Sequence, residues 1–251
     1  MKAAGLTKRP AYLAYHWFWR SLDWLYPPAC GGCGRKGNRW CLKCQNGADQ
    51  LGNQVCSVCG TPSQTFQVCP SCQGNKSPLK ALRSWAFFSG PVREALHRLK
   101  YKRDMGLGEA LAQPLIELYD SLDWGAELIL PVPLSQERLK ERGYNQASFL
   151  AQPIALACGV RYASHALKKI KNTPSQVGLS PKQRRENVSG AFWADQSCIY
   201  GKRVVIVDDV MTTGATLEAC GQALLAAGAS DVWGLTLARA YHDPVKNMRQ
   251  L

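Results

Sequence analysis

VVIVDDVMTTGATL, residues 204–217, combines a strand, a short loop and the start of a helix. Its first four residues are β-branched, which is typical of a buried strand, and we expect this strand to end in two adjacent acids, Asp208 and Asp209. The loop of residues 211–214 then enters an alanine-rich helix that we expect to run to Gly228, a residue suited to a helix C-cap.

The loop has the composition of an anion-binding site. Backbone amides at a helix N-terminus attract anions, a glycine lets a phosphate approach closely, and threonines add hydroxyl donors. The two acids can accept hydrogen bonds from vicinal hydroxyls and help to hold a hydrated Mg²⁺. A sugar phosphate therefore fits, and its candidate ligands are Asp208, Asp209, Thr212, Thr213, Gly214, Ala215 and Thr216. A P-loop is excluded because the chain has no G-x-x-x-x-G-K-[ST].

Strand-like and helix-like segments alternate on both sides of this stretch. The predicted strands lie near residue 85 and at 127–133, 198–209 and 231–239, and the predicted helices at 90–104, 108–121, 145–158 and 214–227. Such alternation favours a parallel sheet flanked by helices. We therefore expect an α/β domain over residues 81–242.

Eight of the eleven cysteines form four C-x-x-C pairs in the preceding segment, residues 29–76. The pairs are Cys30/Cys33, Cys41/Cys44, Cys56/Cys59 and Cys69/Cys72. Two such pairs complete a tetrahedral Cys₄ zinc site, so we expect a small domain with two structural zinc ions. Pairing in sequence order is the simplest arrangement, and interleaved pairing is the alternative. A disulfide framework fits poorly with a cytoplasmic chain.

The first 28 residues form a separate aromatic segment. A helix here would place Leu13, Trp17, Arg20 and Trp24 at helical spacing before Pro27. We expect this stripe to pack on the rest of the protein; a membrane-surface or partner-binding helix is the alternative. The segment is a poor signal peptide because charged residues interrupt it and no cleavage site follows, so we expect a cytoplasmic location.

Charge narrows the choice of partners. The chain has 31 Lys and Arg against 18 Asp and Glu, a formal charge of +13, which favours anionic partners such as phosphates or nucleic acid. No run of about 18 apolar residues is present, so we expect no transmembrane segment.

Further motifs indicate a family. The segment at 204–217 resembles the phosphoribosyl-pyrophosphate motif of type I phosphoribosyltransferases. LSQERLKERGYNQ at 134–146, NTPSQVGLSPKQRRENVSGAF at 172–192 and VREALHRLKYKRD at 92–104 are similar to elements of the ComF (competence protein F) family. That resemblance covers about residues 26–240. It implies a type I phosphoribosyltransferase-like sheet preceded by a double zinc ribbon.

The resemblance also implies roles for individual residues. Phosphoribosyl pyrophosphate with Mg²⁺ would be the ligand, and Asp208, Asp209 and Arg142 would be catalytic if the protein is an enzyme. The pyrophosphate loop and a mobile lid would supply Arg138, Arg142, Gln176, Arg184, Arg185 and Lys100. Arginine suits this role because it binds phosphate in a planar, bidentate fashion.

Three functions remain open. The first is a phosphoribosyltransferase-like protein of unknown acceptor. The second, implied by the family name, is a DNA-binding accessory protein in DNA uptake, which would use a retained phosphoribose pocket on single-stranded DNA. The third is a zinc-ribbon adaptor with a vestigial pocket, and the intact Asp208-Asp209 and Thr-Thr-Gly-Ala-Thr segment disfavours it.

Overall fold

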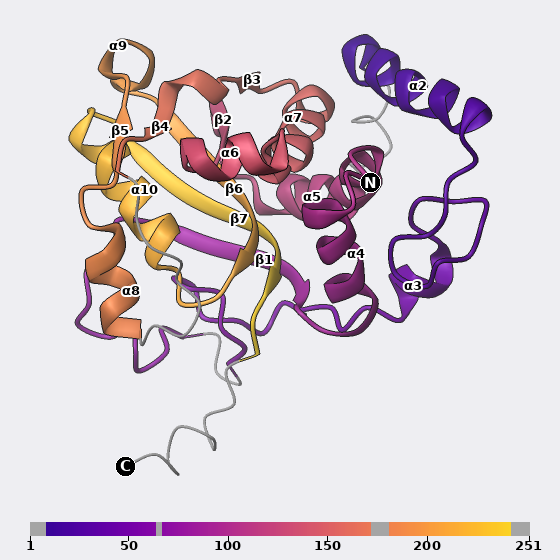
Figure 1. Ribbon diagram of the computed structural model, residues 1–251. Coiled ribbons are helices and arrows are strands. Elements are labelled where there is room, and N and C mark those ends of the chain that lie inside the picture. Colours follow the sequence, from indigo (N-terminus) through magenta and orange to yellow (C-terminus); the bar gives the residue numbers. More distant parts are fainter. Residues whose placement is uncertain (1–8, 64–66, 172–180, 242–251) are drawn as a thin grey trace.

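The centre of the molecule is a five-stranded sheet in which every pair of neighbouring strands is parallel (Figure 1). The computed structural model describes residues 9–63, 67–171 and 181–241. The sheet order is β1-β7-β6-β2-β3, with bounds β1 Ala81–Phe87, β2 Leu128–Pro131, β3 Arg161–Tyr162, β6 Arg203–Met211 and β7 Asp231–Arg239. The predicted α/β class is confirmed.

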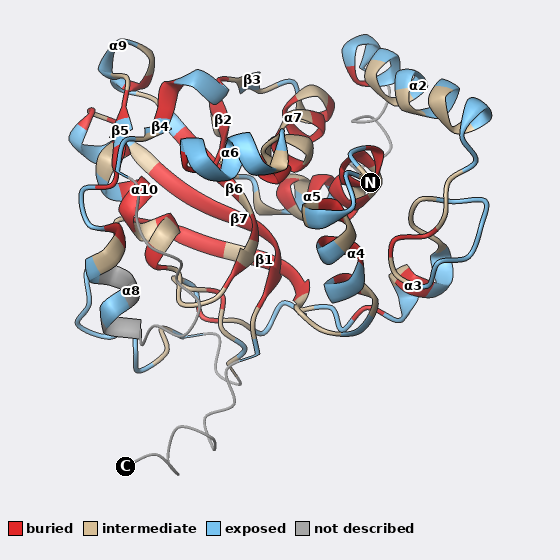
Figure 2. Ribbon diagram, in the orientation of Figure 1, coloured by how far each residue is buried: buried red, intermediate tan, exposed pale blue. Residues whose placement is uncertain are grey.

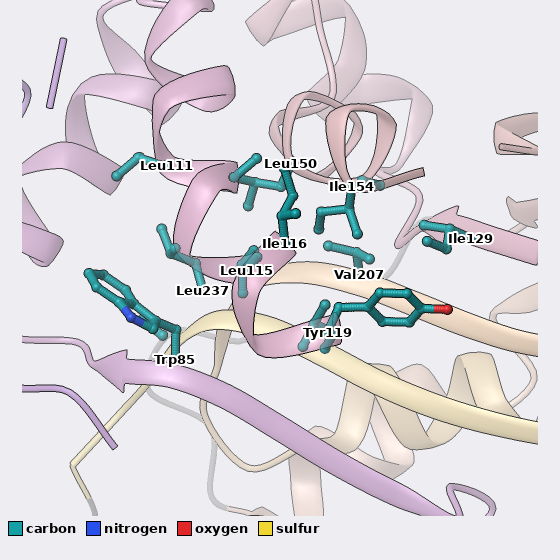
Figure 3. Packing of buried hydrophobic residues seen from close by; sticks show 14 of the residues in the cluster. Trp85, Leu111, Leu115, Ile116, Tyr119, Ile129, Leu150, Ile154, Val207 and Leu237 are labelled. Atoms are coloured by element: carbon teal, nitrogen blue, oxygen red, sulfur yellow. The ribbon is translucent and has the colours of Figure 1, made fainter. Parts of the chain in front are cut away.

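Helices cover both faces of this sheet. Helices α4 (Gly90–Tyr101), α5 (Gly106–Leu122) and α7 (Gln146–Cys158) cover one face, and α8 (Pro181–Val188) and α10 (Ala215–Ala226) lie on the other. Figure 3 shows Ile116 and Ile154 packing toward Val207 on the first face. Two separate hydrophobic clusters result, one on each side of the sheet.

The central strand β6 contributes alternately to these two clusters. Val205 and Val207 belong to the α5/α7 cluster, whereas Val204 and Ile206 belong to the α10 cluster. Because side chains alternate along a strand, the two acids that follow lie on opposite faces. All four apolar residues are fully buried, so the register of the strand is fixed (Figure 2).

Strand β6 differs from its predicted bounds at both ends. Residues 198–199 are not part of it, because the Asp195 side chain caps a short helix, α9 (Gln196–Ile199), by accepting from the Ser197 amide at 3.0 Å. The strand also continues past the two acids to Met211, which pairs with Arg239 on β7. Helices α4 and α10 end before residues 104 and 228, where the predictions placed their ends.

A small antiparallel pair stands beside the main sheet. It consists of β4 (Leu167–Lys169) and β5 (Phe192–Ala194), preceded by a 3₁₀ turn, η1 (Ser164–Ala166). The described part of the predicted lid is therefore strand and helix, in β4 and α8. Residues 172–180, at its middle, lie outside the described residues.

The N-terminal helix α2 (Pro10–Leu25) turns a different face inward than predicted. Trp17 and Trp24 are 67% and 85% exposed, so the predicted packing of this stripe is wrong. Tyr12 is buried instead and donates to the carboxylate of Glu109 on α5 at 3.3 Å. His16 contacts the same carboxylate at 2.8 Å, so polar partners fix the orientation of the helix.

Among the described residues, none of the helices has both the length and the apolar composition that crossing a membrane requires.

Candidate functional site

Eight cysteines gather into two four-sulfur clusters, each made from consecutive C-x-x-C pairs. The first ribbon holds Cys30, Cys33, Cys41 and Cys44, and the second ribbon holds Cys56, Cys59, Cys69 and Cys72. Within each cluster the sulfurs lie within 4.8 Å of one another. Pairing in sequence order is thereby confirmed, and the interleaved alternative is excluded.

The spacing of the sulfurs fits zinc. Zn–S bonds of about 2.3 Å place the corners of a tetrahedron about 3.8 Å apart. The Sγ atoms of Cys30 and Cys44 are 3.6 Å apart, and those of Cys33 and Cys41 are 3.8 Å apart. In the second ribbon, Cys59 and Cys69 are separated by 3.6 Å. Both clusters therefore fit structural zinc.

Backbone amides support the thiolates that a metal needs. Burial opposes ionisation of Cys30, but N–H donors from Cys33, Cys41 and Gly32 outweigh it and lower the pKa to about 6. Cys56 has the same surroundings, and its pKa is also lowered to about 6. Burial and the neighbouring sulfurs raise the pKa of Cys44, Cys69 and Cys72, because thiolates this close to one another require a cation.

The two ribbons attach to different parts of the α/β domain. The first lies against the α4–α5 side, where Arg98 on α4 donates to the Cys30 carbonyl at 3.1 Å. The second lies along the outer edge of β1, where the Leu82 amide donates to the Val58 carbonyl at 2.7 Å. Arg239, at the end of β7, donates to the Cys59 carbonyl at 3.1 Å.

Asp208 and Asp209 lie in the last part of β6, with a lysine beside them. The ammonium of Lys100, on α4, forms an ion pair with Asp209, whose side chain is only 6% exposed. Although burial opposes ionisation of Asp209, Lys100 outweighs it and lowers the pKa of this carboxyl. Burial and the charge of Asp209 raise the pKa of Asp208. One cation thus balances two acids, which leaves Asp208 open to a second cation or to hydroxyl donors.

The turn that follows α6 (Gln136–Arg142) holds Lys100 in place. The hydroxyl of Tyr144 donates to the Leu99 carbonyl on α4, and the Asn145 amide donates to the Val132 carbonyl after β2 at 2.9 Å. These bonds join α4 to the start of α7. The 92–104 and 134–146 motifs, far apart in sequence, therefore meet at Asp209.

Arg142 lies at the same junction. Its guanidinium is 5.3 Å from the centre of the Tyr101 ring and donates to the side-chain oxygen of Gln146. Gly143 ends α6 in the left-handed region at φ 82°, where a side chain would be strained. Burial opposes the charged form of Lys100, but the two acids outweigh it and raise the pKa of this group, and the nearby charge of Arg142 acts in the opposite direction to the acids.

The Thr212–Thr216 loop begins at the end of β6. Gly214 has φ 82° and is the N-cap of α10, and the Ala215 amide donates to the Thr213 hydroxyl at 3.4 Å. Asp208 and residues 210–217 line a hollow of about 20 Å³. The hollow, the N-terminus of a 12-residue helix and an acid therefore lie together, an arrangement suited to a sugar phosphate.

Among the predicted site residues that the structure describes, Arg138 does not join this group. Arg138 is exposed on α6, and its charge acts on Lys169 of β4. Gln176 lies outside the described residues, as do the side chains of Arg184 and Arg185 on α8.

Three polar residues at the site were missed by the sequence reasoning. Thr236 on β7 pairs in register with Asp208, and its fully buried hydroxyl lies 2.7 Å from that of Ser84 on β1. Arg239 is buried at the end of the same strand. Thr236 lies between Leu235 and Leu237, and this isolation in an apolar stretch was the available signal.

Comparison with known proteins agrees with the geometry. Residues 21–73 match the double zinc ribbon domain, and residues 139–246 match the phosphoribosyl transferase domain. The DNA utilization protein YhgH of Escherichia coli O6:H1 is 32% identical over 205 residues, which cover 79% of this chain and 89% of the relative.

Two other relatives carry competence names. Competence protein F of Haemophilus influenzae is 30% identical over 79% of this chain and 96% of its own length. Competence protein ComFC of Bacillus subtilis is 28% identical over 88% of this chain and 89% of its own. With this coverage, and with both domains present, the chain belongs to the ComF (competence protein F) family.

Proposed function

We propose that the protein binds phosphoribosyl pyrophosphate together with Mg²⁺ at the end of β6. The observation that carries the proposal is the buried Lys100–Asp209 pair beside Asp208 and the Thr212–Thr216 loop. This edge offers acceptors for sugar hydroxyls, donors for a phosphate and cations for a leaving group. The phosphoribosyl transferase domain match at residues 139–246 supports the same conclusion.

Each part of the ligand has a partner in this arrangement. The 5-phosphate would bind the loop amides and hydroxyls, and the ribose hydroxyls would bind Asp208 and Asp209. Lys100 and Arg142 would hold the pyrophosphate, whose release leaves positive charge on the ribose. Bound Mg²⁺ would neutralise part of the pyrophosphate charge. Burial and the charge of Asp209 raise the pKa of Asp208, and such an ion would favour its ionised form.

The lid belongs to the proposal as well. Gln176, Arg184 and Arg185 would close over the pyrophosphate and exclude water. Arg138 would join them only by a movement of α6, since its side chain is exposed.

Calorimetric titration with phosphoribosyl pyrophosphate and Mg²⁺ tests the site. The double variant Asp208→Asn/Asp209→Asn should weaken binding by about a hundredfold or more, because two charged contacts are lost. Asp49→Asn, at an exposed acid near the first ribbon, is the matched control and should bind like the wild type. A wild-type protein that fails to bind with Mg²⁺ would refute the proposal.

A DNA-handling role is the second candidate, favoured by the names of the relatives. In that case the phosphoribose site would serve single-stranded DNA, helped by the basic surface. Binding of a single-stranded oligonucleotide should then weaken steeply as salt rises. Absence of binding even at low salt would exclude this role.

A further inference from the structure

A second cavity lies between the second ribbon and the phosphate loop. Its volume is about 230 Å³. The ribbon contributes Val58, Thr61 and Ser71 to its wall, and the opposite wall includes residues 211–214. The second ribbon therefore borders the loop that we propose holds the phosphate.

The ribbon wall is fixed firmly to the sheet. Arg239 donates to the Cys59 carbonyl at 3.1 Å and to the Thr61 hydroxyl at 2.8 Å. Gly60 has φ 68°, and a Cβ there would lie 2.5 Å from the Leu82 carbonyl oxygen. Because the backbone approaches so closely, the ribbon and the strand form a single rigid wall. The cavity is consequently part of the fold, set by contacts on both sides.

The cavity lies at one particular end of the phosphoribose site. The hollow on the loop is lined by Asp208 as well as by the loop, but the larger cavity shares only the loop residues with it. Asp209, Lys100 and Arg142 are not among its described lining residues. A group in the cavity would therefore reach the ligand through the phosphate and not through C1 of the ribose.

The charges around the cavity select an uncharged group. Its charged lining residues in the described part of the chain are Glu218, Arg239 and the zinc-ligand cysteines Cys59 and Cys72. Four thiolates around Zn²⁺ carry a net charge of 2 − 4 = −2, and Arg239 is already bonded to the ribbon. A second phosphate would be repelled, whereas a group with hydroxyl or N–H donors would be attracted.

The size of the cavity points the same way. Pockets for drug-sized ligands have volumes of roughly 300–1,000 Å³, so this smaller cavity suits a group no larger than one nucleoside. Val58, Leu79 and Leu82 offer it apolar surface, and Thr61 and Ser71 offer hydroxyls. A sugar or base joined to the phosphate has this mixed character.

We propose that the cavity between the second ribbon and the phosphate loop binds the nucleoside joined to the 5-phosphate of the ligand, so that the site accepts a phosphodiester as well as a phosphomonoester. The inference rests on the proposed function, because it requires a phosphate on the loop. It assigns the second ribbon a direct contact with the ligand, in addition to its structural role.

Two probes and a pair of matched variants test this inference. The probes are ribose 5-phosphate and its ester with the 3′-hydroxyl of thymidine, which is a dinucleotide without its second base. Ser71→Trp fills the cavity from the second knuckle of the second ribbon, and Lys43→Trp places the same side chain at the equivalent, exposed position of the first ribbon. Val58→Trp is an independent second filling variant. Zinc content should stay at two ions per chain in each.

We expect the wild type to bind both probes. Ser71→Trp and Val58→Trp should weaken the thymidine ester about tenfold or more and change ribose 5-phosphate binding by no more than about twofold. Lys43→Trp should change neither. The inference is overturned if the wild type binds ribose 5-phosphate but not the ester, or if the filling variants affect both probes equally or not at all. If neither probe binds but phosphoribosyl pyrophosphate with Mg²⁺ does, the inference alone is overturned, whereas failure of all three to bind refutes the proposed function as well.

Discussion

The two zinc ribbons have the same ligands and the same spacing of sulfurs, yet their neighbours differ. The first ribbon joins helices: Arg39 contacts Asp104 before α5 at 3.1 Å and also pairs with Asp23 on α2. The second ribbon joins the edge strand β1 of the sheet, and Arg239 at the end of β7 holds it beside Met211 and the phosphate loop. One metal motif thus connects helices on the α4–α5 side, and its neighbour forms a wall next to the phosphate loop.

Loss of zinc should give the largest difference in ligand binding between the two ribbons. Cys69→Ser/Cys72→Ser should weaken phosphoribosyl pyrophosphate binding by about a hundredfold or more, because the wall beside the loop loses its metal. Cys41→Ser/Cys44→Ser should weaken it by about fivefold or less. Calorimetry with zinc content measured on the same samples provides the comparison. Equal losses in both variants would show that the ribbons differ only in position.

Removal of the arginines that hold the ribbons should give a smaller difference, seen in the free energy of unfolding. Arg239→Met leaves the partly buried Cys59 carbonyl and Thr61 hydroxyl without their donor, so we expect a loss of about 2–3 kcal/mol in the free energy of unfolding. Arg98→Met is the matched change at the first ribbon. Its side chain is 31% exposed, and water can replace part of its bonds, so the loss should be about 1 kcal/mol. Urea unfolding measures both, and a larger loss for Arg98→Met would contradict the account.

The acids between the two ribbons give a pH-dependent test. The folded protein binds a proton at Asp208 more tightly than the unfolded chain does, since its pKa is raised. Between the unfolded and folded pKa values the native state therefore holds more protons, and stability should fall as the pH rises through the folded pKa. Asp208→Asn should remove this contribution. Unfolding measured upward from about pH 4, the ordinary pKa of an aspartic acid, would refute the assignment if the variant keeps the wild-type slope.

The smallest effects concern α2, which contacts the first ribbon. Tyr12→Phe removes a buried hydroxyl that donates to Glu109 and should lower the free energy of unfolding by about 1 kcal/mol. Trp24→Ser, at a position 85% exposed, should change it by no more than about 0.5 kcal/mol. Thermal unfolding of the two variants decides which face of the helix packs on the protein. A larger loss of stability for Trp24→Ser than for Tyr12→Phe would show that the predicted stripe packs on the protein.

Much of the fold could be predicted from local patterns in the sequence. The run of β-branched residues before Asp208 predicted the central strand, and the C-x-x-C spacing predicted two four-sulfur clusters because knuckle geometry is local. The orientation of α2 did not follow, because all sides of this helix carry aromatic residues. Its direction depends on Glu109, about a hundred residues away, and no local pattern contains that contact.

The candidate site was predictable to the same degree. Asp208, Asp209 and the threonine loop are contiguous, so a motif could reveal them. The central position of Lys100 depends on Tyr144 and Asn145 joining α4 to the start of α7, which only the folded chain shows. The contact of the second ribbon with the loop likewise depends on Arg239. In the sequence this residue is only the last one of a predicted strand and belongs to no motif.

A crystal structure of the protein with phosphoribosyl pyrophosphate and Mg²⁺ tests the central claim most directly. The account predicts the 5-phosphate on the backbone of residues 212–216, the ribose hydroxyls on Asp208 and Asp209, and the pyrophosphate on the side of Lys100. A ligand bound elsewhere, or a phosphate that avoids the loop while the Lys100–Asp209 pair stays closed, would contradict it.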